Sequence, residues 1–367
     1  MKKKKIYKVL GIMTGTSMDG IDISYTSTDG INKIKIFKEK SYQYSLKEQI
    51  RLKNIKIKKI SQTKLINNQD IIVSSLIIKY LKKFFKEFNI IKNNIDYISL
   101  SGQTVLHIPN KKITIQLGNP KLISNFFKIN VISNFRINDI KHGGQGAPIG
   151  AFYHKLLIKK INSNSIIINL GGVANFALKY KNNFISSDIG PANAISDDLM
   201  LYYYNKKYDK NGKIASRGNV NKKLFDLFKN DKFFKKKFPK SLDRNNFNYL
   251  FDKLKKIDAF DALRTSLNFT IFSILYLLDN KICSNINEII FTGGGRKNKY
   301  LISQLRKLKN ELKISIIDDY GFNGDLIESQ MFAYIGIRSL KKLILSTPYT
   351  TGVNKSITGG NLYKFNS

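Results

Sequence analysis

The chain has 367 residues, of which 42% are hydrophobic and 12% aromatic, a composition typical of a folded protein with room for two cores. Its 63 Lys and Arg outnumber 26 Asp and Glu, which gives a formal net charge of +37. Such a charge usually indicates nucleic acid or an anionic membrane as a partner. Here the lysines are scattered among Asn and Ile along the whole chain, which favours the compositional bias of an AT-rich genome over a dedicated binding surface.

Cysteine usage and hydropathy exclude two further classes of protein. Cys283 is the only cysteine, so no intramolecular disulfide and no cysteine-based zinc site can form, and we expect a cytoplasmic location. The lysines at positions 2–5 are not followed by the long apolar run of a signal peptide. The apolar run at residues 267–278 is too short to cross a bilayer and contains polar residues.

Three short runs rich in β-branched residues each lead into glycines. The runs cover residues 6–10, 166–170 and 289–292, and helical spacing of apolar residues marks segments 69–88, 196–204 and 258–278. A buried strand that leads directly into a glycine turn delivers a ligand loop to the carboxyl edge of a sheet. The alternation of strands and helices predicts an α/β architecture.

The first glycine-rich stretch runs from Gly11 to Asp22. Its glycines would let backbone N–H groups face a phosphate, and Thr14, Thr16 and Ser17 would add hydroxyl donors. Asp19 and Asp22 could hold a hydrated Mg²⁺ beside the phosphates. The alternative is a glycine-rich hairpin turn with Asp-Gly at its tip.

Two candidate ligand groups follow in the middle of the chain. His107, shortly after Gln103-Thr104, either binds a ligand or makes a structural hydrogen bond. Arg136 has a forked guanidinium suited to a substrate carboxylate, and the glycines that follow it allow a close approach. A surface salt bridge between Arg136 and Asp139 is the alternative.

Three candidates remain in the second half of the chain. Asp188 ends the run 183–187 before a Gly-Pro turn, where a stiff backbone would hold a catalytic base; an Asx turn is the alternative. The stretch 292–298 has three glycines where a strand-to-helix turn needs one, so a flat ring or a phosphate could pack on its backbone. Glu328, near the start of the last helix, either complements the helix dipole or binds substrate.

These motifs together resemble the anhydro-N-acetylmuramic acid kinase family, over essentially the whole chain. The matching segments, in chain order, are 15–22, 102–105, 134–136, 143–148, 169–175, 188–191, 208–212, 239–241, 247–248, 292–295, 324–325, 328 and 332–333. The resemblance implies the two-lobed, actin-like (ribonuclease H-like) α/β ATPase fold, with a nucleotide and substrate cleft between the lobes, and commonly a homodimer. We expect residues 1–130 and 342–367 to form lobe I and residues 131–341 to form lobe II.

The resemblance also implies the reaction. An ATP-dependent enzyme of this family opens the 1,6-anhydro ring with water and phosphorylates O6, which gives N-acetylmuramic acid 6-phosphate in peptidoglycan recycling. By motif, Asp188 is the base that activates water. ATP would be bound by Gly15, Thr16, Ser17, Met18, Asp19, Gly20, Ile21, Asp22, Gly171 and Gly172, with Asp19 at the Mg²⁺ and with Gly293, Gly294, Gly295 and Asn298 on the adenosine side. The expected substrate contacts are Arg136, Glu328 and His107.

The sequence departs from the family pattern at two positions. Ala192 stands where the family usually has Gly, and Ser101 where a His commonly precedes Gly-Gln-Thr. If position 192 required a positive φ, alanine would strain the loop by roughly 1 kcal/mol or more. The alternatives are a kinase for another sugar or a small acid, a weakened relative of the family, and a binder of nucleic acid or anionic surfaces; we expect no specific nucleic acid and no membrane as partners.

Overall fold

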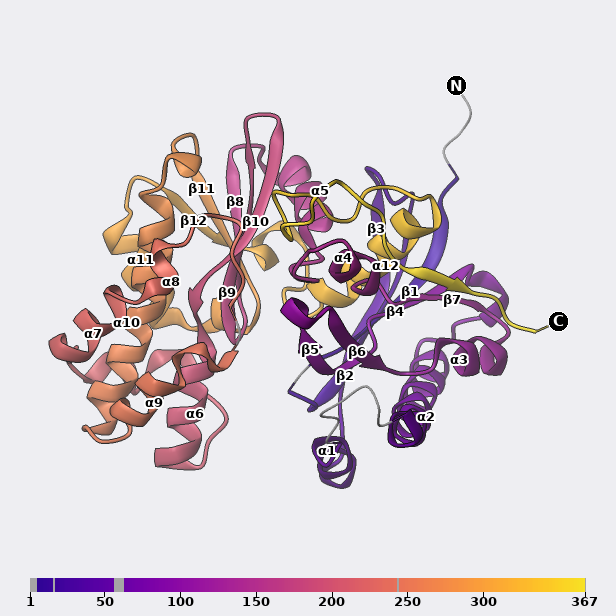
Figure 1. Ribbon diagram of the computed structural model, residues 1–367, viewed down its shortest axis with the longest axis horizontal. Helices are drawn as coiled ribbons and strands as arrows, with labels where there is room; N and C mark the ends of the chain where they lie inside the picture. The colour runs from indigo at the N-terminus through magenta and orange to yellow at the C-terminus, as the bar shows by residue number, and fades with distance from the viewer. Residues whose placement is uncertain (1–4, 16, 56–62, 243, 367) are drawn as a thin grey trace. The chain divides into compact units, whose positions relative to one another are not determined.

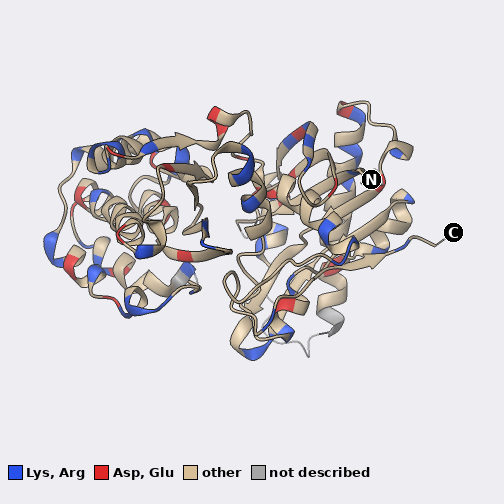
Figure 2. Cartoon of the chain, turned by 90° about the horizontal axis from the view of Figure 1, so that it is seen from above, with Lys and Arg blue, Asp and Glu red and all other residues tan. Residues whose placement is uncertain are grey.

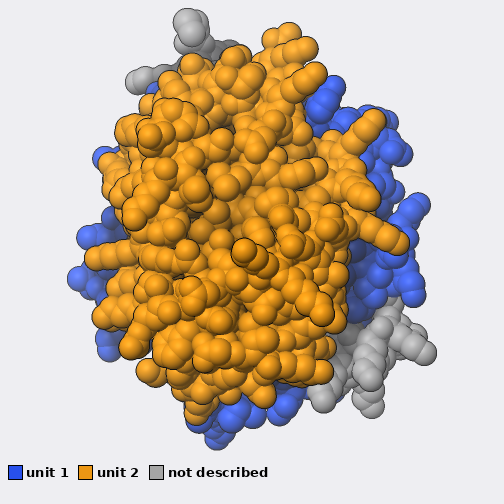
Figure 3. All heavy atoms as spheres, turned by 90° about the vertical axis from the view of Figure 1, so that its left-hand side faces the viewer, with its two compact units in different colours: residues 1–156, 326–367 blue, residues 157–325 orange. Residues whose placement is uncertain are grey.

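The computed structural model describes residues 5–15, 17–55, 63–242 and 244–366 (Figure 1). The chain divides into two compact units, which Figure 3 colours separately. Unit 1 comprises Met1–Leu156 and Leu326–Ser367, and unit 2 comprises Leu157–Asp325. Each unit is built on one large β-sheet with helices packed against it, so the predicted α/β class is confirmed.

Unit 1 contains a six-stranded sheet in the order β13-β7-β4-β1-β2-β3. β2 is antiparallel to both β1 and β3, whereas β4 is parallel to β1 and β7 is parallel to β4. The side chains of Leu10, Ile12, Ile21 and Ile23 are fully buried and form part of the core. The strands are β1 Tyr7–Thr14, β2 Gly20–Thr28, β3 Ile34–Gln43, β4 Tyr97–Leu100, β7 Asn130–Ser133 and β13 Asn361–Tyr363.

The longest helix of unit 1, α2 (Thr63–Glu87), contains most of the helix expected at 69–88. It buries the apolar face that the spacing predicted, including Ile77, Leu81 and Phe84. A separate hairpin consists of β5 (Gln103–Ile108) and β6 (Ile113–Leu117). The other helices are α1 Leu46–Lys53, α3 Pro120–Phe127, α4 Ile137–Lys141 and α5 Ala151–Ile161, the last of which leads into unit 2.

One helix of unit 1, α12 (Ile327–Leu340), packs on β1, β2 and β4 at short range. Gly11 of β1 makes this possible, because a Cβ there would overlap the backbone carbonyl of Ser329. Small residues continue the contact, since the hydroxyls of Ser24 and Ser329 lie 2.6 Å apart. The expectation that Gly11 bends a phosphate loop was wrong, because β1 continues through Gly11 to Thr14.

Unit 2 contains a five-stranded sheet in the order β10-β9-β8-β11-β12. β9 is antiparallel to both β8 and β10, and β11 is parallel to both β8 and β12. The predicted runs at 166–170 and 289–292 fall in β8 and β11. The strands are β8 Ser165–Leu170, β9 Val173–Tyr180, β10 Asn183–Pro191, β11 Glu288–Thr292 and β12 Lys313–Ile316.

The central helix of unit 2 is α10 (Ala259–Leu278), which lies in the core beside β10. Its Phe269 stacks on Phe228 of α7, with ring centroids 4.3 Å apart. Although α10 contains the apolar run 267–278, none of the described helices is long and apolar enough to cross a membrane. The remaining helices are α6 Asn193–Tyr204, α7 Lys222–Lys229, α8 Lys232–Lys235, α9 Asn248–Leu254 and α11 Lys299–Leu308.

The two sheets share one strand order. Numbered within each unit along the chain, and leaving aside the β5–β6 hairpin, the strands lie in the order 3-2-1-4-5, with β13 added at one edge in unit 1. In both units the first three strands pair antiparallel in chain order. The fourth and fifth strands run parallel to the first. This repeated order is that of the actin-like, ribonuclease H-like fold, so the predicted fold class is confirmed.

Two segments that the sequence assigned to lobe II lie in unit 1, namely residues 131–156 and 326–341. The reason is that β7 pairs with β4 and α12 packs on β1, so both segments complete the unit 1 sheet. Such pairings join parts of the chain that are far apart in sequence. The units therefore divide at 156/157 and 325/326 instead of at 130/131 and 341/342.

The positive charge is distributed over both units. Figure 2 shows Lys and Arg on helices and loops throughout each unit, with Asp and Glu between them. The basic residues thus gather on no single element of the described chain. This distribution supports the interpretation of the net charge as a compositional bias.

Replacement of Gly11 by alanine tests the close contact between β1 and α12. The new Cβ would overlap the Ser329 carbonyl, so the helix or the strand must move, and we expect a loss of about 1–3 kcal/mol of stability in urea unfolding. Gly294→Ala is the matched control, since a Cβ at Gly294 would meet no heavy atom within 4 Å. Equal unfolding midpoints for Gly11→Ala and the parent protein would contradict this account of the packing.

Candidate active site

The first glycine-rich stretch forms the tip of the hairpin between β1 and β2. Pairing of the two strands extends to Thr14 and Ile21, so the loop is limited to residues 15–19. Gly20, Ile21 and Asp22, which we expected to bind ATP, therefore lie in β2, and Thr16 lies outside the described residues. The backbone is thus the hairpin of the alternative interpretation, and its tip is the part that a phosphate could reach.

The connection between β4 and β5 holds this loop in place. The Gly15 carbonyl accepts hydrogen bonds from the Met18 N–H at 3.1 Å and from Gln103 Nε2 at 3.0 Å. The Thr14 N–H donates to Ser101 Oγ at 3.1 Å. Serine at position 101, where the family pattern has histidine, therefore contributes a hydroxyl that fixes the loop backbone.

A hydroxyl and a carboxylate lie side by side at the tip of the loop. The exposed Ser17 hydroxyl donates to Asp19 Oδ1 at 2.6 Å. The Asp19 carbonyl in turn accepts from the Tyr44 N–H at 2.9 Å, which ties the loop to the end of β3. The loop thus presents oxygen ligands from a fixed backbone.

Two buried side-chain oxygens beside the loop have no hydrogen-bond partner among the described residues. They are Thr14 Oγ1 and Gln103 Oε1, on residues that are 3% and 1% exposed. Buried polar atoms in proteins are nearly always paired, and neutral oxygens and carboxylates are the ligands that Mg²⁺ and its bound waters accept. In the described ranges no three His, Cys, Asp or Glu side chains gather as a metal cage. With Asp19, the oxygen donors at this loop fit a hydrated Mg²⁺ beside phosphates.

Arg136 lies at the N-cap of α4, shortly after β7. Its Nη1 donates to the Gly146 carbonyl at 2.7 Å. Asp139 accepts from the Gly146 N–H and from Thr351 Oγ1, both at 2.6 Å. Asp139 therefore holds the glycine loop, and the alternative salt bridge between Arg136 and Asp139 is not formed.

Glu328 lies in the first turn of α12, and its side chain is exposed to solvent. The protein around its carboxyl nevertheless raises the pKa of Glu328, and the positive charge of Arg136 opposes this rise. The two predicted substrate contacts of unit 1 thus lie within electrostatic reach of each other. Together they offer a donor and an acceptor to a polar ligand.

His107 of β5 uses both ring nitrogens within the protein. Its Nδ1 lies 3.1 Å from Thr114 Oγ1 of β6, and its Nε2 lies 3.0 Å from the Gln145 carbonyl. The ring therefore links the β5–β6 hairpin to the glycine loop beside Arg136. This is the structural hydrogen bonding of the alternative interpretation, and a direct substrate contact by His107 stays a prediction.

Asp188 lies on β10, immediately before a β-bulge that ends at Gly190. A bulge turns the chain and aims the neighbouring side chain away from the regular sheet direction. The Asp188 N–H donates to the Lys240 carbonyl at 3.0 Å, and Asp188 Oδ2 accepts from the Leu242 N–H at 2.8 Å. The Asx-turn alternative is therefore wrong, because the carboxylate is bound by a distant segment of the chain.

Burial raises the pKa of Asp188 to about 7, and the hydrogen bonds from Leu242 and Ser241 oppose this rise. A carboxyl group with a pKa near 7 is a much stronger base than an exposed aspartate and is still ionised in part at neutral pH. Its side chain is half-buried, so a ligand can reach it. The geometry and the pKa together make Asp188 a suitable general base.

The second glycine turn, Gly171–Gly172, supports the start of α6. The Gly171 carbonyl accepts from the Asn193 N–H at 2.9 Å, and the Gly172 carbonyl accepts from Ala192 and Ala194 at 3.0 and 3.2 Å. Ala192 has a φ of −118°, so this position does not require glycine and the strain considered for it does not arise. Alanine is therefore compatible with the loop that carries Asp188.

Beside these turns, unit 2 contains a cavity of about 350 Å³. Its lining includes the predicted adenosine-side residues Gly294, Gly295 and Asn298. Apolar and polar groups both contribute, as in most small-molecule sites. The other lining residues include Ala192, Asn193, Asp197, Tyr208, Asp209, Ala215, Leu263, Leu267, Thr270 and Leu301.

The three glycines after β11 have different roles. Gly293 has a φ of 75°, and a Cβ there would overlap the Asn169 side chain; a Cβ at Gly295 would press against Leu170. At Gly294 a Cβ would meet nothing within 4 Å, although this residue lines the cavity. Packing within the protein therefore explains Gly293 and Gly295, whereas Gly294 leaves room for a ligand.

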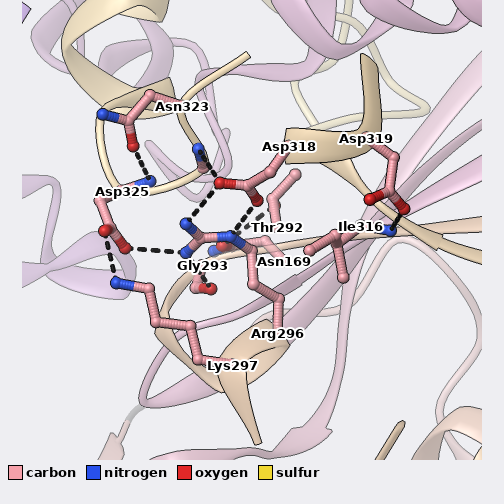
Figure 4. Close-up of polar contacts among 11 residues, drawn as sticks. Asn169, Thr292, Gly293, Arg296, Lys297, Ile316, Asp318, Asp319, Asn323 and Asp325 are labelled. Carbon is pink, nitrogen blue, oxygen red and sulfur yellow. Dashed lines mark hydrogen bonds and ion pairs between the residues drawn. The ribbon is translucent and has the colours of Figure 1, made fainter. Parts of the chain in front are cut away.

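A buried arginine fixes this glycine turn (Figure 4). The Arg296 side chain is 2% exposed and forms two hydrogen bonds to the Asp318 carboxylate, at 2.5 and 3.0 Å. Its Nη1 donates to Asp325 at 2.8 Å and to the Gly293 carbonyl at 3.0 Å. Because a guanidinium is planar and offers several fixed donors, this arrangement sets the orientation of the turn.

The sequence analysis missed three contributions to the site. Gln103 was noted as a hydrogen-bonding residue, but its contact with Gly15 was not foreseen. Arg296 follows the glycine triplet directly, yet its two carboxylate partners lie more than 20 positions further along the chain. Segment 240–242, which binds Asp188, overlaps the matching motif 239–241, and this motif was the one signal that could have pointed to it.

Comparison with known proteins places these features in a family. The sequence profile described as anhydro-N-acetylmuramic acid kinase matches residues 7–365. The anhydro-N-acetylmuramic acid kinase of Pelagibacter ubique is 37% identical, over 98% of this chain and 99% of that relative. The protein of the same name from Zymomonas mobilis is 32% identical, over 96% of this chain and 99% of that relative.

Solved structures resemble the chain at lower similarity. The activator of the 2-hydroxyisocaproyl-CoA dehydratase from Clostridium difficile with bound ADPNP is 11% identical, over 91% of this chain and 96% of its own, with a TM-score of 0.45. The family assignment rests on the sequence matches, which cover nearly the whole chain. On that evidence the chain belongs to the anhydro-N-acetylmuramic acid kinase family.

Proposed function

We propose that this protein uses ATP to open 1,6-anhydro-N-acetylmuramic acid with water and to phosphorylate O6, as part of peptidoglycan recycling. Membership of the family supports the reaction as a whole. The observation that carries the mechanism is Asp188, a half-buried carboxyl group with a pKa of about 7 that is held by the Leu242 N–H. A group of this kind is suited to removing a proton from water.

In the proposed mechanism Asp188 takes a proton from the water that attacks the anomeric carbon. The bond between that carbon and O6 breaks, and O6 leaves with the electron pair. O6 then attacks the γ-phosphorus of ATP, so that ADP is released and N-acetylmuramic acid 6-phosphate is formed. One positioned base and one bound nucleotide thus serve both steps.

The tip of the β1–β2 hairpin is the proposed phosphate site. Gly15, Ser17, Met18 and Asp19 form its described part, and the bond from Gln103 to Gly15 fixes its backbone. Asp19 and the unpaired oxygen of Thr14 would hold Mg²⁺, which neutralises phosphate charge when it is bound. Gly20, Ile21 and Asp22 would contribute from β2, and Gly171 and Gly172 are the proposed ATP contacts from the turn after β8 in unit 2.

The cavity of unit 2 is the proposed adenosine site. Gly294 supports this assignment, because packing among the described residues does not require a glycine there while the residue lines the cavity. Gly295 and Asn298 also line it, and Gly293 shapes the turn through its positive φ. A flat base would lie against bare backbone at this turn.

Arg136 and Glu328 are the proposed substrate contacts. A forked guanidinium binds the carboxylate of the lactyl group, and a carboxylate accepts hydrogen bonds from sugar hydroxyls. The expected homodimer and cytoplasmic location stay predictions, as does the expected lack of a specific nucleic acid partner. A kinase for another sugar or small acid is the second candidate, and assays with ordinary hexoses beside the anhydro sugar distinguish the two.

Replacement of Asp188 by asparagine removes the proposed base and nearly preserves its volume. We expect sugar-dependent ADP release to fall by about 10²–10⁴-fold, while ATP binding measured by calorimetry persists. Asp226→Asn, at an exposed surface position, is the matched control and should retain full activity. Unchanged turnover in Asp188→Asn would refute the assignment of the base.

Isotope labelling tests the hydrolytic step itself. The protein is incubated with ATP, Mg²⁺, the anhydro sugar and ¹⁸O-water, and the product is analysed by mass spectrometry. We expect one ¹⁸O at the anomeric carbon of the sugar phosphate, because water supplies that oxygen in the proposed mechanism. A phosphorylated product without label would contradict the proposed mechanism.

The pH dependence of the reaction reports the ionisation of Asp188. The base must be deprotonated, so kcat/KM for the sugar should rise about tenfold per pH unit below a pH of about 7 and level off above it. The measurement uses a coupled ADP assay between pH 5.5 and 8.5, with the coupling enzymes in excess at every pH. A flat profile over this range would exclude a base with this pKa.

Replacement of Gly294 by valine tests the adenosine site. The side chain would extend into space that the protein leaves open, so stability should stay unchanged while KM for ATP rises by at least about tenfold. Gly321 has a positive φ, so a side chain there would strain the backbone and Gly321→Ala cannot serve as the control. The control is Ser303→Val, on α11. A normal KM for ATP in Gly294→Val would exclude adenosine from this part of the cavity.

A further inference from the structure

Lys240 carries an ammonium group into the interior of unit 2. The residue is 8% exposed, and its Nζ donates to the Phe233 carbonyl at 3.0 Å. Nζ also lies 4.2 Å from the centroid of the Phe233 ring and 5.0 Å from that of Phe238. The rings of Phe234 and Tyr276 complete an aromatic cage at 5.6 and 5.8 Å. Within the described chain, no carboxylate forms an ion pair with this amine.

Packing alone does not account for this arrangement. A buried cation without a carboxylate is costly, and burial lowers the pKa of Lys240 to about 8, assisted by the charge of Lys236. A methionine would fill a similar volume without that cost. Unlike methionine, the amine fixes the end of the side chain in one place, because it is held by the hydrogen bond to the Phe233 carbonyl and by the faces of the aromatic rings.

The backbone of Lys240 is bound to the strand that carries the proposed base. The Lys240 N–H donates to Ser187 Oγ at 2.8 Å, and the Lys240 carbonyl accepts from the Asp188 N–H at 3.0 Å. Ser187 Oγ also donates to that carbonyl at 2.9 Å. Two residues later, the Leu242 N–H donates to the Asp188 carboxylate at 2.8 Å. Segment 240–242 thus runs along the edge of β10 where its regular pairing is interrupted by the bulge.

We infer that Lys240 is a positioning residue for Asp188. Its caged amine anchors segment 240–242, and this anchor places the Leu242 N–H against the carboxylate that activates water. The inference rests on the proposed function of Asp188. It goes further than that function because it makes the Lys240 amine responsible for the position and the basicity of the Asp188 carboxylate.

The test replaces Lys240 by methionine and by arginine. Lys240→Met keeps the apolar stem and removes the amine, so segment 240–242 loses its anchor and Leu242 its fixed position. Because small displacements of a catalytic group are costly, we expect kcat to fall on the order of 10- to 100-fold, with KM for ATP within about twofold of the parent value. Lys240→Arg, which can still donate to the Phe233 carbonyl, should recover at least part of this loss.

A second readout concerns the carboxylate itself. The Leu242 N–H stabilises the charged form of Asp188, so its displacement in Lys240→Met should raise the pKa of Asp188 and move the acid limb of the rate profile to higher pH. Lys237→Met changes an exposed lysine three residues before Lys240; it is the matched control and should leave kcat and the acid limb unchanged. A folded Lys240→Met protein with the parent kcat and the parent acid limb would overturn the inference.

Two further measurements keep the inference testable whatever the variant does. If Lys240→Met does not fold, Ser187→Ala takes its place, because it removes the hydroxyl that binds the Lys240 backbone and leaves the aromatic cage intact. We expect the same shift of the acid limb to higher pH. An unshifted acid limb would count against the inference. Carbon-13 NMR of the aspartate carboxyl groups measures the pKa of Asp188 without substrate. An inactive parent protein would therefore refute the proposed function, whereas an unchanged Asp188 pKa in the variants would refute the role of Lys240.

Discussion

Close packing of a helix against a strand at a glycine determines where the candidate site residues of each unit lie. In unit 1, Gly11 lets β1 touch α12 at Ser329, the residue that follows Glu328. In unit 2, Gly190 lies against α10, because a Cβ there would overlap the hydroxyl of Ser273. Asp188 stands two residues before Gly190. In both units a helix therefore packs closely on a strand at a glycine, against helix backbone in unit 1 and against a serine side chain in unit 2, and a candidate site residue follows or precedes that contact.

Close packing of helix on strand does not by itself fix the conformation of the turns at the strand ends. Buried polar groups fix these turns. Arg296 joins the Gly293 carbonyl to Asp318 and Asp325, and Gln103 joins the Gly15 carbonyl to the β4–β5 connection. Removal of one partner from a buried pair costs about 3–5 kcal/mol, whereas the net stabilisation by an intact pair is small. Such groups are therefore better explained by the orientation they impose than by the stability they add.

Much of the fold follows from local sequence patterns. The runs 6–10, 166–170 and 289–292 are strands that lead to glycines, and the segments 69–88 and 258–278 are helical. Apolar spacing and β-branched residues act over short distances, so these elements are visible in the sequence. The division into units is not, because it depends on which sheet β7 and α12 join. That choice is made by pairing between segments more than 30 residues apart.

The candidate site shows the same division between local and distant information. The stiff strand end at Asp188 was predictable from the Gly-Pro that follows, but its hydrogen-bond donor lies 54 positions away at Leu242. The sequence left open a salt bridge between Asp139 and Arg136, three residues earlier, but Asp139 binds the Gly146 N–H and Thr351 instead. The local sequence therefore predicted which chemical groups lie at the site. Which of these groups contact each other depends on the folded chain.

The surroundings of the two central carboxyl groups distinguish their roles. Desolvation by the surrounding protein raises the pKa of both Asp188 and Glu328. At Glu328 the influence that opposes this rise is the positive charge of Arg136, the other proposed substrate contact. At Asp188 the opposing influence is a pair of neutral donors, so the carboxyl group retains a pKa near neutrality and can exchange a proton with water. The proposed base and the proposed substrate contact thus differ in the groups that surround each carboxyl.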